Sequence, residues 1–481
     1  MQVLPIAALC MLVPACLAAD FTVQRNWGAA DMVDELELRG LVPAVSSQAP
    51  LTGREILQAL PDTGRYRMYR RRLELMYPEN RYRFTVETNL WDVLGDHRRR
   101  PSAESSSMLG LLGSNGTWSF VAFNAFQTGE RVSSSSTGYS WRGMAANSDQ
   151  IYVRWSPPGG HVQLGKDYLK TGAGLALSGR RPYEMIHGHY NLNPMLRLTS
   201  FTGQLDAYAD SNGIGNRYLA GHRIELRTKQ ICIGVNEYVL YGGIGRVMSW
   251  YYLLPFYVYQ GEQINRPFDD NVIWDADAKI IIPPVRFKAE VMIDDIQIER
   301  KSKTDQEPQE VGLLCQLSVA VVTAPVMISQ HIEYTIITGW TYNQVKPWNR
   351  WLENGAPLGA EFGNDFDRLE LATTFLGPCY RGLISLSFLR KGQGSITDDW
   401  TEPWINDPAW TSRFPAGIVE KKWTAVFSGQ RDFLSRYRSL NILSSLSMRI
   451  GYESITNVGH QPGYHQIRLE AAGGIAVGFY F

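Results

Sequence analysis

Two stretches crowded with tryptophan hold the residues of this sequence whose types and spacing best suit ligand recognition. Trp400, Trp404 and Trp410 stand in "DDWTEPWINDPAWTSRFPAG", and Trp348 and Trp351 stand with Trp340 in "GWTYNQVKPWNRW". An indole ring can stack on the apolar face of a sugar ring, while neighbouring Asp, Asn and Arg side chains bond to its hydroxyl groups. The alternative is that these rings form the aromatic girdle at the two surfaces of a membrane protein. Both interpretations stay open for the first stretch, whose acidic neighbours place it in water.

Patterns typical of enzymes and metal sites are weak. The stretch "GGHVQLGKDY" has Gly160, Gly165 and Lys166 at the spacing of a phosphate-binding loop, but Asp167 replaces the Ser or Thr that should hold magnesium. His187 and His189 would share one face of a strand, without a third metal ligand nearby in the sequence. No G-x-S-x-G elbow occurs. We therefore expect no enzyme, no cofactor and no bound metal.

Composition and the first residues restrict the class of protein. The chain is 20% charged with a formal net charge of +0, which argues against a nucleic-acid-binding protein. The apolar run "MQVLPIAALCMLVPACLAAD" predicts a signal peptide over residues 1–19, with lipid attachment at Cys16 as the alternative. The exported chain would keep Cys232, Cys315 and Cys379, which are too few for a disulfide framework. One disulfide or three free buried thiols are the options.

Residues 20–78 have the pattern of short helices. "AADMVDELELRGL" shows helical spacing of apolar residues, and Thr52 and Glu55 in "LTGREILQAL" are placed as in a capping box. A third candidate helix, "TGRYRMYRRRLELM", is strongly basic. We expect a small periplasmic helical plug segment here.

From residue 79 to residue 481 the pattern changes to a period of two. "YRFTVETNLW", "HRIELRT", "RFKAEVMIDD" and the final "HQIRLEAAGGIAVGFYF" alternate an apolar face with a face of small or charged residues of both signs. This is typical of a barrel with lipid outside and ion pairs in a wet lumen. Some 400 residues at about 20 to 25 per strand give roughly sixteen to twenty antiparallel strands. Because lipid cannot satisfy a sheet edge, the last strand, ending at Phe481, should pair with the first, near Tyr82.

Three polar stretches are expected to be loops. They are "RRRPSAESSSMLGLLGSNG", "KSKTDQEPQE" and "DDWTEPWINDPAWTSRFPAG". Long loops of such barrels lie outside the cell and short turns lie in the periplasm.

Several stretches, in order along the chain, resemble the capsule-assembly Wzi family of outer-membrane proteins. They include "PLTGREILQAL", "LGKDYLKTGAGLALSGRRP", "NRYLAGHRIELR", "DDNVIWDADAKI", "GAPLGAEFGNDFDRLEL" and "RFPAGIVEKKW". The resemblance implies an antiparallel transmembrane β-barrel of about eighteen strands with a small N-terminal periplasmic helical bundle. It also implies a non-enzymatic, lectin-like role in holding polysaccharide at the cell surface.

Candidate binding positions carried over from the resemblance are Arg217, His222 and Arg223 in "GNRYLAGHRIELR", Asp270 and Asn271 in "DDNVIWDAD", and Asp294 and Asp295 in "MIDDIQ". The last two also stand where the alternation slips by one residue, because Ile296 and Ile298 resume the apolar face, and this predicts a β-bulge.

Together these observations favour a monomeric, all-β outer-membrane protein that binds and anchors capsular or extracellular polysaccharide. Its expected partners are that polysaccharide and outer-membrane lipid, and no nucleic acid. The alternative is a channel (porin) for saccharide or anionic solutes. A lipid- or glycan-modifying enzyme is a third option, and it would need a compact Ser/His or carboxylate cluster at the outer rim.

Overall fold

A computed structural model describes most of the chain. The described residues are 29–48, 83–94, 102–115, 117–128, 142, 144–211, 213–265, 270–295, 307–322, 326–377, 379–407, 410–437 and 440–480. The expected signal peptide, the second and third candidate helices of residues 20–78, and Phe481 lie outside these ranges.

The expectation of an all-β antiparallel fold is confirmed. In the part of the chain that the structure describes, one sheet contains nineteen strands, and β15 (Leu352–Glu353) and β16 (Ala356–Pro357) form a separate small ribbon. The strands of the large sheet are β1 (Arg83–Leu94), β2 (Ser102–Ser114), β3 (Trp118–Thr128), β4 (Met144–Trp155), β5 (Gly160–Lys170), β6 (Ser178–Asn191), β7 (Leu196–Gln204), β8 (Tyr208–Asp210), β9 (Gly213–Arg227), β10 (Ile231–Gly243), β11 (Asn271–Ile282), β12 (Val285–Asp295), β13 (Glu310–Val322), β14 (Met327–Ile337), β17 (Phe366–Leu376), β18 (Tyr380–Lys391), β19 (Glu420–Tyr437), β20 (Leu440–Thr456) and β21 (His465–Tyr480).

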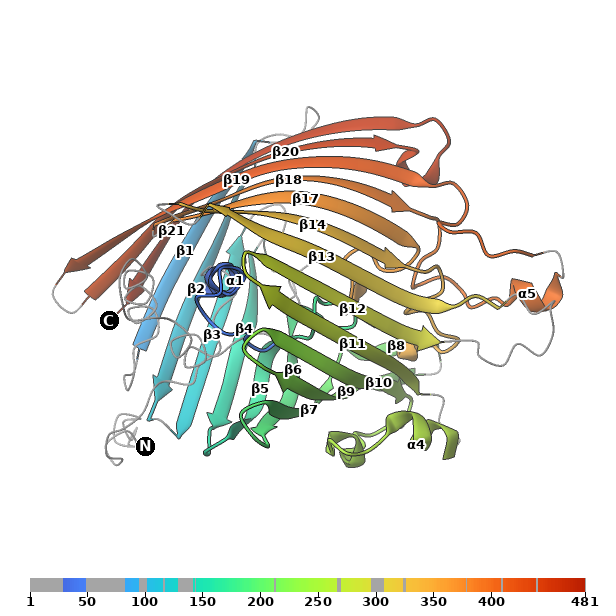
Figure 1. Ribbon diagram of the computed structural model, residues 1–481. Helices are drawn as coiled ribbons and strands as arrows, with labels where there is room; N and C mark the ends of the chain where they lie inside the picture. The colour runs from blue at the N-terminus through green and yellow to red at the C-terminus, as the bar shows by residue number, and fades with distance from the viewer. Residues whose placement is uncertain are drawn as a thin grey trace.

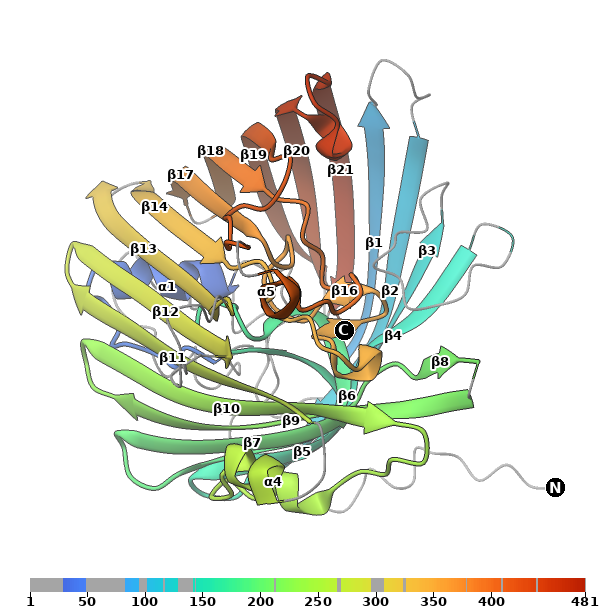
Figure 2. The same cartoon turned by 90° about the vertical axis from the view of Figure 1, so that its right-hand side faces the viewer.

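The order of pairings runs in a ring. Among the described strands, β8 pairs with β9 alone, and the other eighteen strands pair antiparallel with their neighbours in chain order. The last strand, β21, pairs in turn with β1, from Thr85 opposite Tyr480 to Leu94 opposite Ala471. This is the pairing expected from the need to satisfy both edges of the sheet in lipid, and Figures 1 and 2 show the two strands side by side. We call this ring of strands the barrel.

The two ends of the barrel differ in their connections. Strands β2, β4, β6, β9, β11, β13, β17 and β19 are each followed by only two to four residues before the next strand. The connections at the opposite end are longer and hold η4 (Trp250–Leu253), α4 (Tyr259–Asn265), η5 (Pro347–Asn349), α5 (Pro403–Asn406) and η6 (Val458–His460). We call these the short-turn end and the long-loop end. The expectation of a loop over "RRRPSAESSSMLGLLGSNG" is wrong for Ser102–Ser114, which form β2.

The outer wall of the barrel is apolar. On β9 and β10, for example, Ile224, Leu226, Ile233 and Val235 are 42–48% exposed, while the polar residues Arg223, Glu225 and Asn236 beside them point inward and are buried. Among the described residues the three cysteines are free, so no disulfide joins them. The expected burial holds for Cys232 but is wrong for Cys379, which is exposed.

The short-turn end of the lumen contains the described part of the expected helical segment. Helix α1 (Ala29–Leu38) lies inside the ring in Figures 1 and 2. The buried Lys279 of β11 donates from Nζ to Glu37 Oε1 at 2.7 Å, and the N–H of Ala44 donates to the carbonyl of Lys229 at 3.0 Å. Among the helices that the structure describes, none is both long and apolar enough to cross a bilayer.

Two long-loop-end connections, residues 171–177 and 338–365, fold inward and form what we call the plug. Their apolar side chains belong to one buried cluster with lumenal residues of strands from β5 to β18. The Tyr342 hydroxyl donates to the carbonyl of Leu175 at 2.5 Å, and burial raises the pKa of Tyr342 so that it stays a donor. Glu290 of β12 accepts the N–H groups of Gly174 and Leu175, each at 2.8 Å. The plug is therefore fixed to the wall as well as to itself.

Candidate functional site

Four tryptophans gather at the long-loop end and form what we call the tryptophan cluster. Trp340 comes from the connection after β14, and Trp400, Trp404 and Trp410 come from the connection between β18 and β19, around α5. The ring centroid of Trp340 lies 5.2 Å from that of Trp400 and 5.3 Å from that of Trp404, with interplanar angles of 70° and 87°. Trp404 and Trp410 are 5.6 Å apart. The two pairs of Trp340 are edge-to-face, which is a preferred aromatic geometry.

The cluster adjoins a cavity of about 810 Å³. Trp340 and Trp410 line it, together with the polar residues Glu307, Gln309, Thr338, Asn343, Asp365, Ser395, Asp398, Thr411, Ser412 and Arg413. This volume is in the range of ordinary small-molecule sites. The cavity thus joins aromatic surface to carboxylate, amide, hydroxyl and guanidinium groups, which suits a polyhydroxylated ligand.

Asp365 organises the wall of this cavity. It has a positive φ of 54° and is fully buried. Its carboxylate accepts the N–H of Gly394 at 2.8 Å and that of Ala416 at 3.0 Å, so it joins the start of β17 to both ends of the β18–β19 connection. A Cβ added at Gly392 would lie 2.0 Å from Asp365 Oδ2, which explains why this close approach needs glycine. Asp365 is therefore a positioning residue for the cavity.

Asp398 lies at the exposed rim of the cavity. Its side chain accepts the N–H of Ser395 at 2.8 Å, and its backbone carbonyl accepts Arg350 Nη2 at 2.7 Å. Arg350 belongs to the connection between β14 and β17, so this bond joins the two loops that carry the tryptophan cluster. The described cavity residues include three carboxylates and no histidine.

The other two predicted tryptophans lie apart from the cluster. Trp351 is fully buried in the plug, where its Nε1–H donates to the carbonyl of Ala176 at 2.8 Å, and it has no surface for a ligand. Trp348 is half-buried, with its ring centroid 5.7 Å from that of Tyr208.

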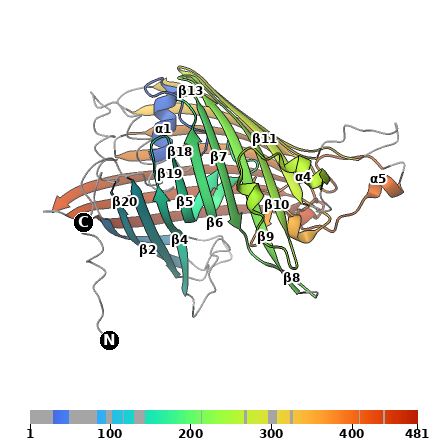
Figure 3. The ribbon, with the colours of Figure 1, turned by 90° about the horizontal axis from the view of Figure 1, so that it is seen from below.

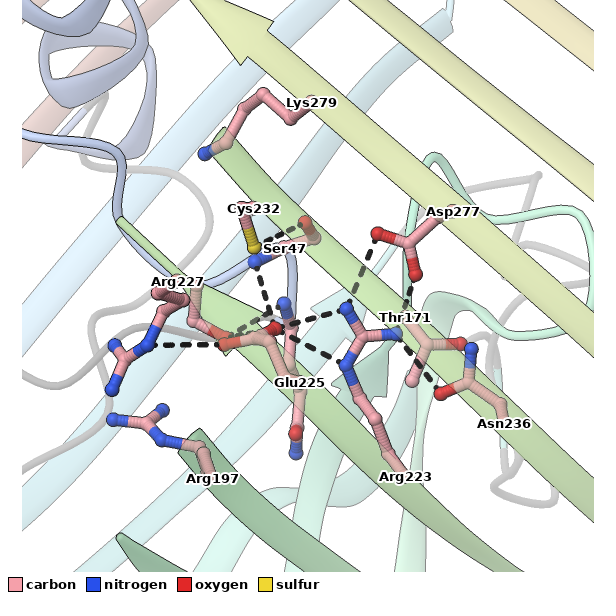
Figure 4. A network of polar contacts seen from close by, with 12 residues as sticks. Ser47, Thr171, Arg197, Arg223, Glu225, Arg227, Cys232, Asn236, Asp277 and Lys279 are labelled. Atoms are coloured by element: carbon pink, nitrogen blue, oxygen red, sulfur yellow. Dashed lines mark hydrogen bonds and ion pairs between the residues drawn. The ribbon is translucent and has the colours of Figure 1, made fainter. Parts of the chain in front are cut away.

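Arg217, Arg223 and Asn271 point into the lumen and are structural. Arg217 donates to the backbone carbonyls of Trp348, Arg350 and Leu352 at 2.7–2.8 Å, so it holds the plug. Arg223 donates to Glu225 Oε2 at 2.9 Å, to Asn236 Oδ1 at 3.0 Å and to Asp277, in a buried network that Figure 4 shows. Asn271 donates from Nδ2 to the carbonyl of Asn349 at 3.1 Å.

His222 and Asp270 lie on the outer wall. His222 Nε2 is 3.3 Å from Glu237 Oε2, and Asp270 Oδ2 is 2.8 Å from Arg246 Nη2. Both pairs are covered by residues 244–265, and neither residue lines the cavity.

Asp294 accepts the backbone N–H of Tyr342 at 2.6 Å, and Asp295 is exposed. The expected bulge is confirmed, because the pairing of β12 with β13 shifts register between Ile293 and Asp295.

The structure thus brings together Trp400, Trp404 and Trp410 and separates them from the other nine candidate residues. Sequence reasoning did not select Trp340, Asp365, Asp398 or Arg413 as site residues. A signal existed for Trp340, which stands in the second tryptophan-rich stretch. Asp365 carries no such signal, because its role depends on contacts between distant loops.

No protein-family model and no curated protein sequence matches the chain. Among solved structures, the chain is similar to Wzi of Escherichia coli, an outer-membrane protein involved in group 1 capsule assembly and described as a carbohydrate-binding β-barrel. The TM-score is 0.66 at 15% identity, over 95% of this chain and 99% of the other. Pseudomonas aeruginosa OccD3 has a TM-score of 0.47 at 7% identity, over 83% of this chain and 91% of its own. The match to OpdK of the same organism has a TM-score of 0.45 at 11% identity, over 83% and 98%. At these identities the likeness to Wzi is one of fold, that of an outer-membrane β-barrel.

Proposed function

We propose, starting from the fold shared with a carbohydrate-binding outer-membrane barrel, that this chain spans the outer membrane and anchors capsular or extracellular polysaccharide at the cell surface. The observation that carries the proposal is the tryptophan cluster beside its polar cavity at the long-loop end. The chain is proposed to act as a monomeric lectin without catalysis.

The two faces of the barrel wall support the proposed placement in a membrane. The outer wall exposes aliphatic and aromatic side chains. The lumen holds ion pairs, such as Arg223 with Asp277 on the wall and Lys279 of the wall with Glu37 of α1. In barrels of this kind the long loops lie outside the cell and the short turns lie in the periplasm. The tryptophan cavity would then face the surface polysaccharide, and α1 would lie at the periplasmic end.

The chemistry of the cavity supports a glycan as the ligand. Trp340 and Trp410 are half-buried, so each keeps part of its ring available for stacking. Asp398 and Arg413 are exposed at the same cavity and can bond to hydroxyl or acidic groups of a sugar. One bound segment of a long polymer would be enough to tether it. Binding of the same polymer by many copies of the protein would raise the avidity above the affinity of one site.

The runner-up is a channel for saccharide or anionic solutes. One observation favours it: a second cavity of about 830 Å³ lies in the lumen, where Asp34 and Glu35 of α1 face Arg286, Arg381, Arg449 and Glu470. The plug argues against a continuous pore, because it connects lumenal residues of strands from β5 to β18. We therefore favour the anchoring role.

Retention of polysaccharide on immobilised protein tests the proposal. The full exported chain, purified in detergent, would be compared with the double variant Trp340→Ala, Trp410→Ala, using surface polysaccharide extracted from the source cells. We expect binding by the unmodified protein and at least about tenfold weaker binding by the variant, since a loss of about 1.4 kcal/mol suffices. The matched control is Trp423→Ala, whose ring lies on the outer wall and is 49% exposed. Absence of binding by the unmodified protein would refute the function, and unchanged binding by the variant would refute the site.

A further inference from the structure

The connection between β10 and β11 folds back over the outside of the barrel. Residues 244–265, which we call the outer-wall segment, include η4 and α4, and Figures 1 and 3 show α4 outside the ring beside β9 and β10. Tyr252 and Tyr259 of this segment are buried against Tyr218, Val239 and other residues of the wall. The segment also reaches β7, where the Ser200 hydroxyl donates to the carbonyl of Leu253 at 2.5 Å.

The segment covers charged residues on a wall that is otherwise apolar. Glu237 is 1% exposed and accepts the N–H groups of Tyr259 and Gln260, each at 2.9 Å. His222 Nε2 lies 3.3 Å from the same carboxylate, and the His222 and Tyr259 ring centroids are 4.5 Å apart. A charged residue on the lipid-facing side of a barrel is costly near the middle of the bilayer. The outer-wall segment supplies the hydrogen bonds that lipid cannot.

The position of these residues places the segment within the apolar belt. His222 is five residues above Arg227, which begins the paired part of β9 and β10 at the short-turn end. At about 3.3 Å per residue and a tilt of roughly 40°, this height is on the order of 13 Å, within a belt about 25 Å tall. The covering residues at the level of His222 must therefore lie in the belt as well.

The face of the segment that points away from the wall is strongly apolar. Val247, Trp250, Leu254, Phe256 and Val258 are 71%, 64%, 56%, 78% and 56% exposed. This surface continues the apolar wall below it, where Ile224 and Val235 are 48% and 45% exposed. The Arg246–Asp270 pair, with 2.8 Å between Nη2 and Oδ2, is close to the upper edge of the strands. The apolar face thus lies at the level of the acyl chains, and the charged pair lies near the level of the lipid headgroups, as expected for a segment at a membrane interface.

We propose that the outer-wall segment is seated in the outer leaflet and that its apolar face binds lipid acyl chains. This lipid-binding role rests on the membrane placement that is part of the proposed function, and it is independent of glycan binding. At this place the segment, and not the wall of β9 and β10, would form the surface that contacts lipid. Glu237 and His222 would therefore stay out of contact with lipid. The occupant is lipid rather than protein because the surface is continuous with the lipid-facing wall.

Spin-label accessibility tests the proposal. Phe256→Cys would carry a nitroxide in a chain whose Cys232, Cys315 and Cys379 are replaced by Ser, reconstituted in phosphatidylethanolamine and phosphatidylglycerol vesicles. Val235→Cys, on the bare wall, is the control for lipid, and Asp399→Cys, in an exposed loop, is the control for water. We expect the ratio of oxygen to nickel-chelate accessibility at Phe256 to match that at Val235 and to exceed that at Asp399 severalfold.

Three results would overturn the proposal, and they differ from one another. An aqueous ratio at Phe256 with a lipid ratio at Val235 would mean that the segment stands in water. Spin–spin broadening at Phe256 that disappears on dilution with unlabelled protein would mean that a second copy covers it. An aqueous ratio at Val235 as well would remove the membrane placement itself, and with it the proposed function.

Discussion

The Nε1–H of Trp351 donates to the backbone carbonyl of Ala176 at 2.8 Å, and this bond joins two inward-folded connections that are far apart in the chain. Trp351 precedes the β15–β16 ribbon of one connection, and Ala176 lies between β5 and β6 in the other. Both residues are fully buried, in the same apolar cluster. The two connections are therefore joined to each other inside the lumen.

The plug predicts how the barrel behaves in a planar bilayer. We expect no steady conductance from the unmodified protein and a measurable rise for Trp351→Ala, because removing a buried tryptophan costs about 3–5 kcal/mol and also removes the bond to Ala176. The control is Trp348→Ala, since Trp348 is half-buried outside the apolar cluster. A silent Trp351→Ala barrel, or a steady pore in the unmodified protein, would show that the plug does not close the lumen.

Gly359 tests the same contact from the backbone side. A Cβ at this position would lie 1.9 Å from the carbonyl oxygen of Leu175, which cannot move without displacing residues 171–177. We expect Gly359→Ala to lower the temperature at which heating unfolds the barrel and changes its mobility on a gel. We also expect a higher conductance, because overpacking costs about 1–3 kcal/mol. Gly473→Ala is the control, because no atom lies within 4 Å of its added Cβ. Equal behaviour of the two variants would contradict this packing.

The buried network around Arg223 predicts a large loss of stability. Arg223→Met leaves Asp277 and Glu225 without their shared guanidinium, which typically costs about 3–5 kcal/mol. We expect a lower unfolding midpoint in denaturant, and partial recovery in the triple variant with Glu225→Gln and Asp277→Asn. Arg449→Met, at an exposed arginine, is the control with a small expected effect. If the triple variant is no more stable than Arg223→Met, unpaired charge is not the cause.

Glu353 predicts a pH dependence of the plug. Burial raises the pKa of Glu353 to about 7, and the Asp206 carboxylate adds to this effect. The folded chain therefore binds this proton more tightly than the unfolded chain, whose Glu titrates near 4.5. The stabilisation is complete below about pH 4.5 and is lost as the pH rises to about 7, to the extent of about 3 kcal/mol at most. We expect Glu353→Gln to reduce the fall in unfolding midpoint between pH 5 and pH 8, and an unchanged slope would assign that fall to other groups.

Much of the sheet could be predicted from the sequence because alternation is a local property. Adjacent residues such as Ile224 and Glu225 point to opposite faces of a strand whatever their partners are. A period of two in the sequence therefore predicts which residues face outward and which face the lumen. The pairing of β21 with β1 also follows, since neither edge can remain open in lipid. The loop expected over Ser102–Ser114 was wrong because the first half of this strand, residues 102–107, holds no large apolar residue that would reveal the alternation.

The site was only partly predictable, because residues of the same type have different roles in the structure. Trp351 and Trp410 both stand in tryptophan-rich, polar stretches, yet one is in the plug core and the other lines the cavity. Asp270 and His222 have polar types suited to a lumen, but they lie on the outer wall, where residues 244–265 cover them. Such placements depend on contacts between distant loops, which no local pattern records.

The share of surface polysaccharide that stays with cells after gentle washing tests the anchoring role most directly. Cells lacking the native protein would produce either the unmodified chain or the double variant Trp400→Ala, Trp404→Ala. An equal change of gel mobility on heating would show that both barrels fold. We predict that polysaccharide stays with cells carrying the unmodified chain and passes into the medium with the variant. Equal retention by both would contradict binding at the tryptophan cluster, and equal release by both would contradict the anchoring function.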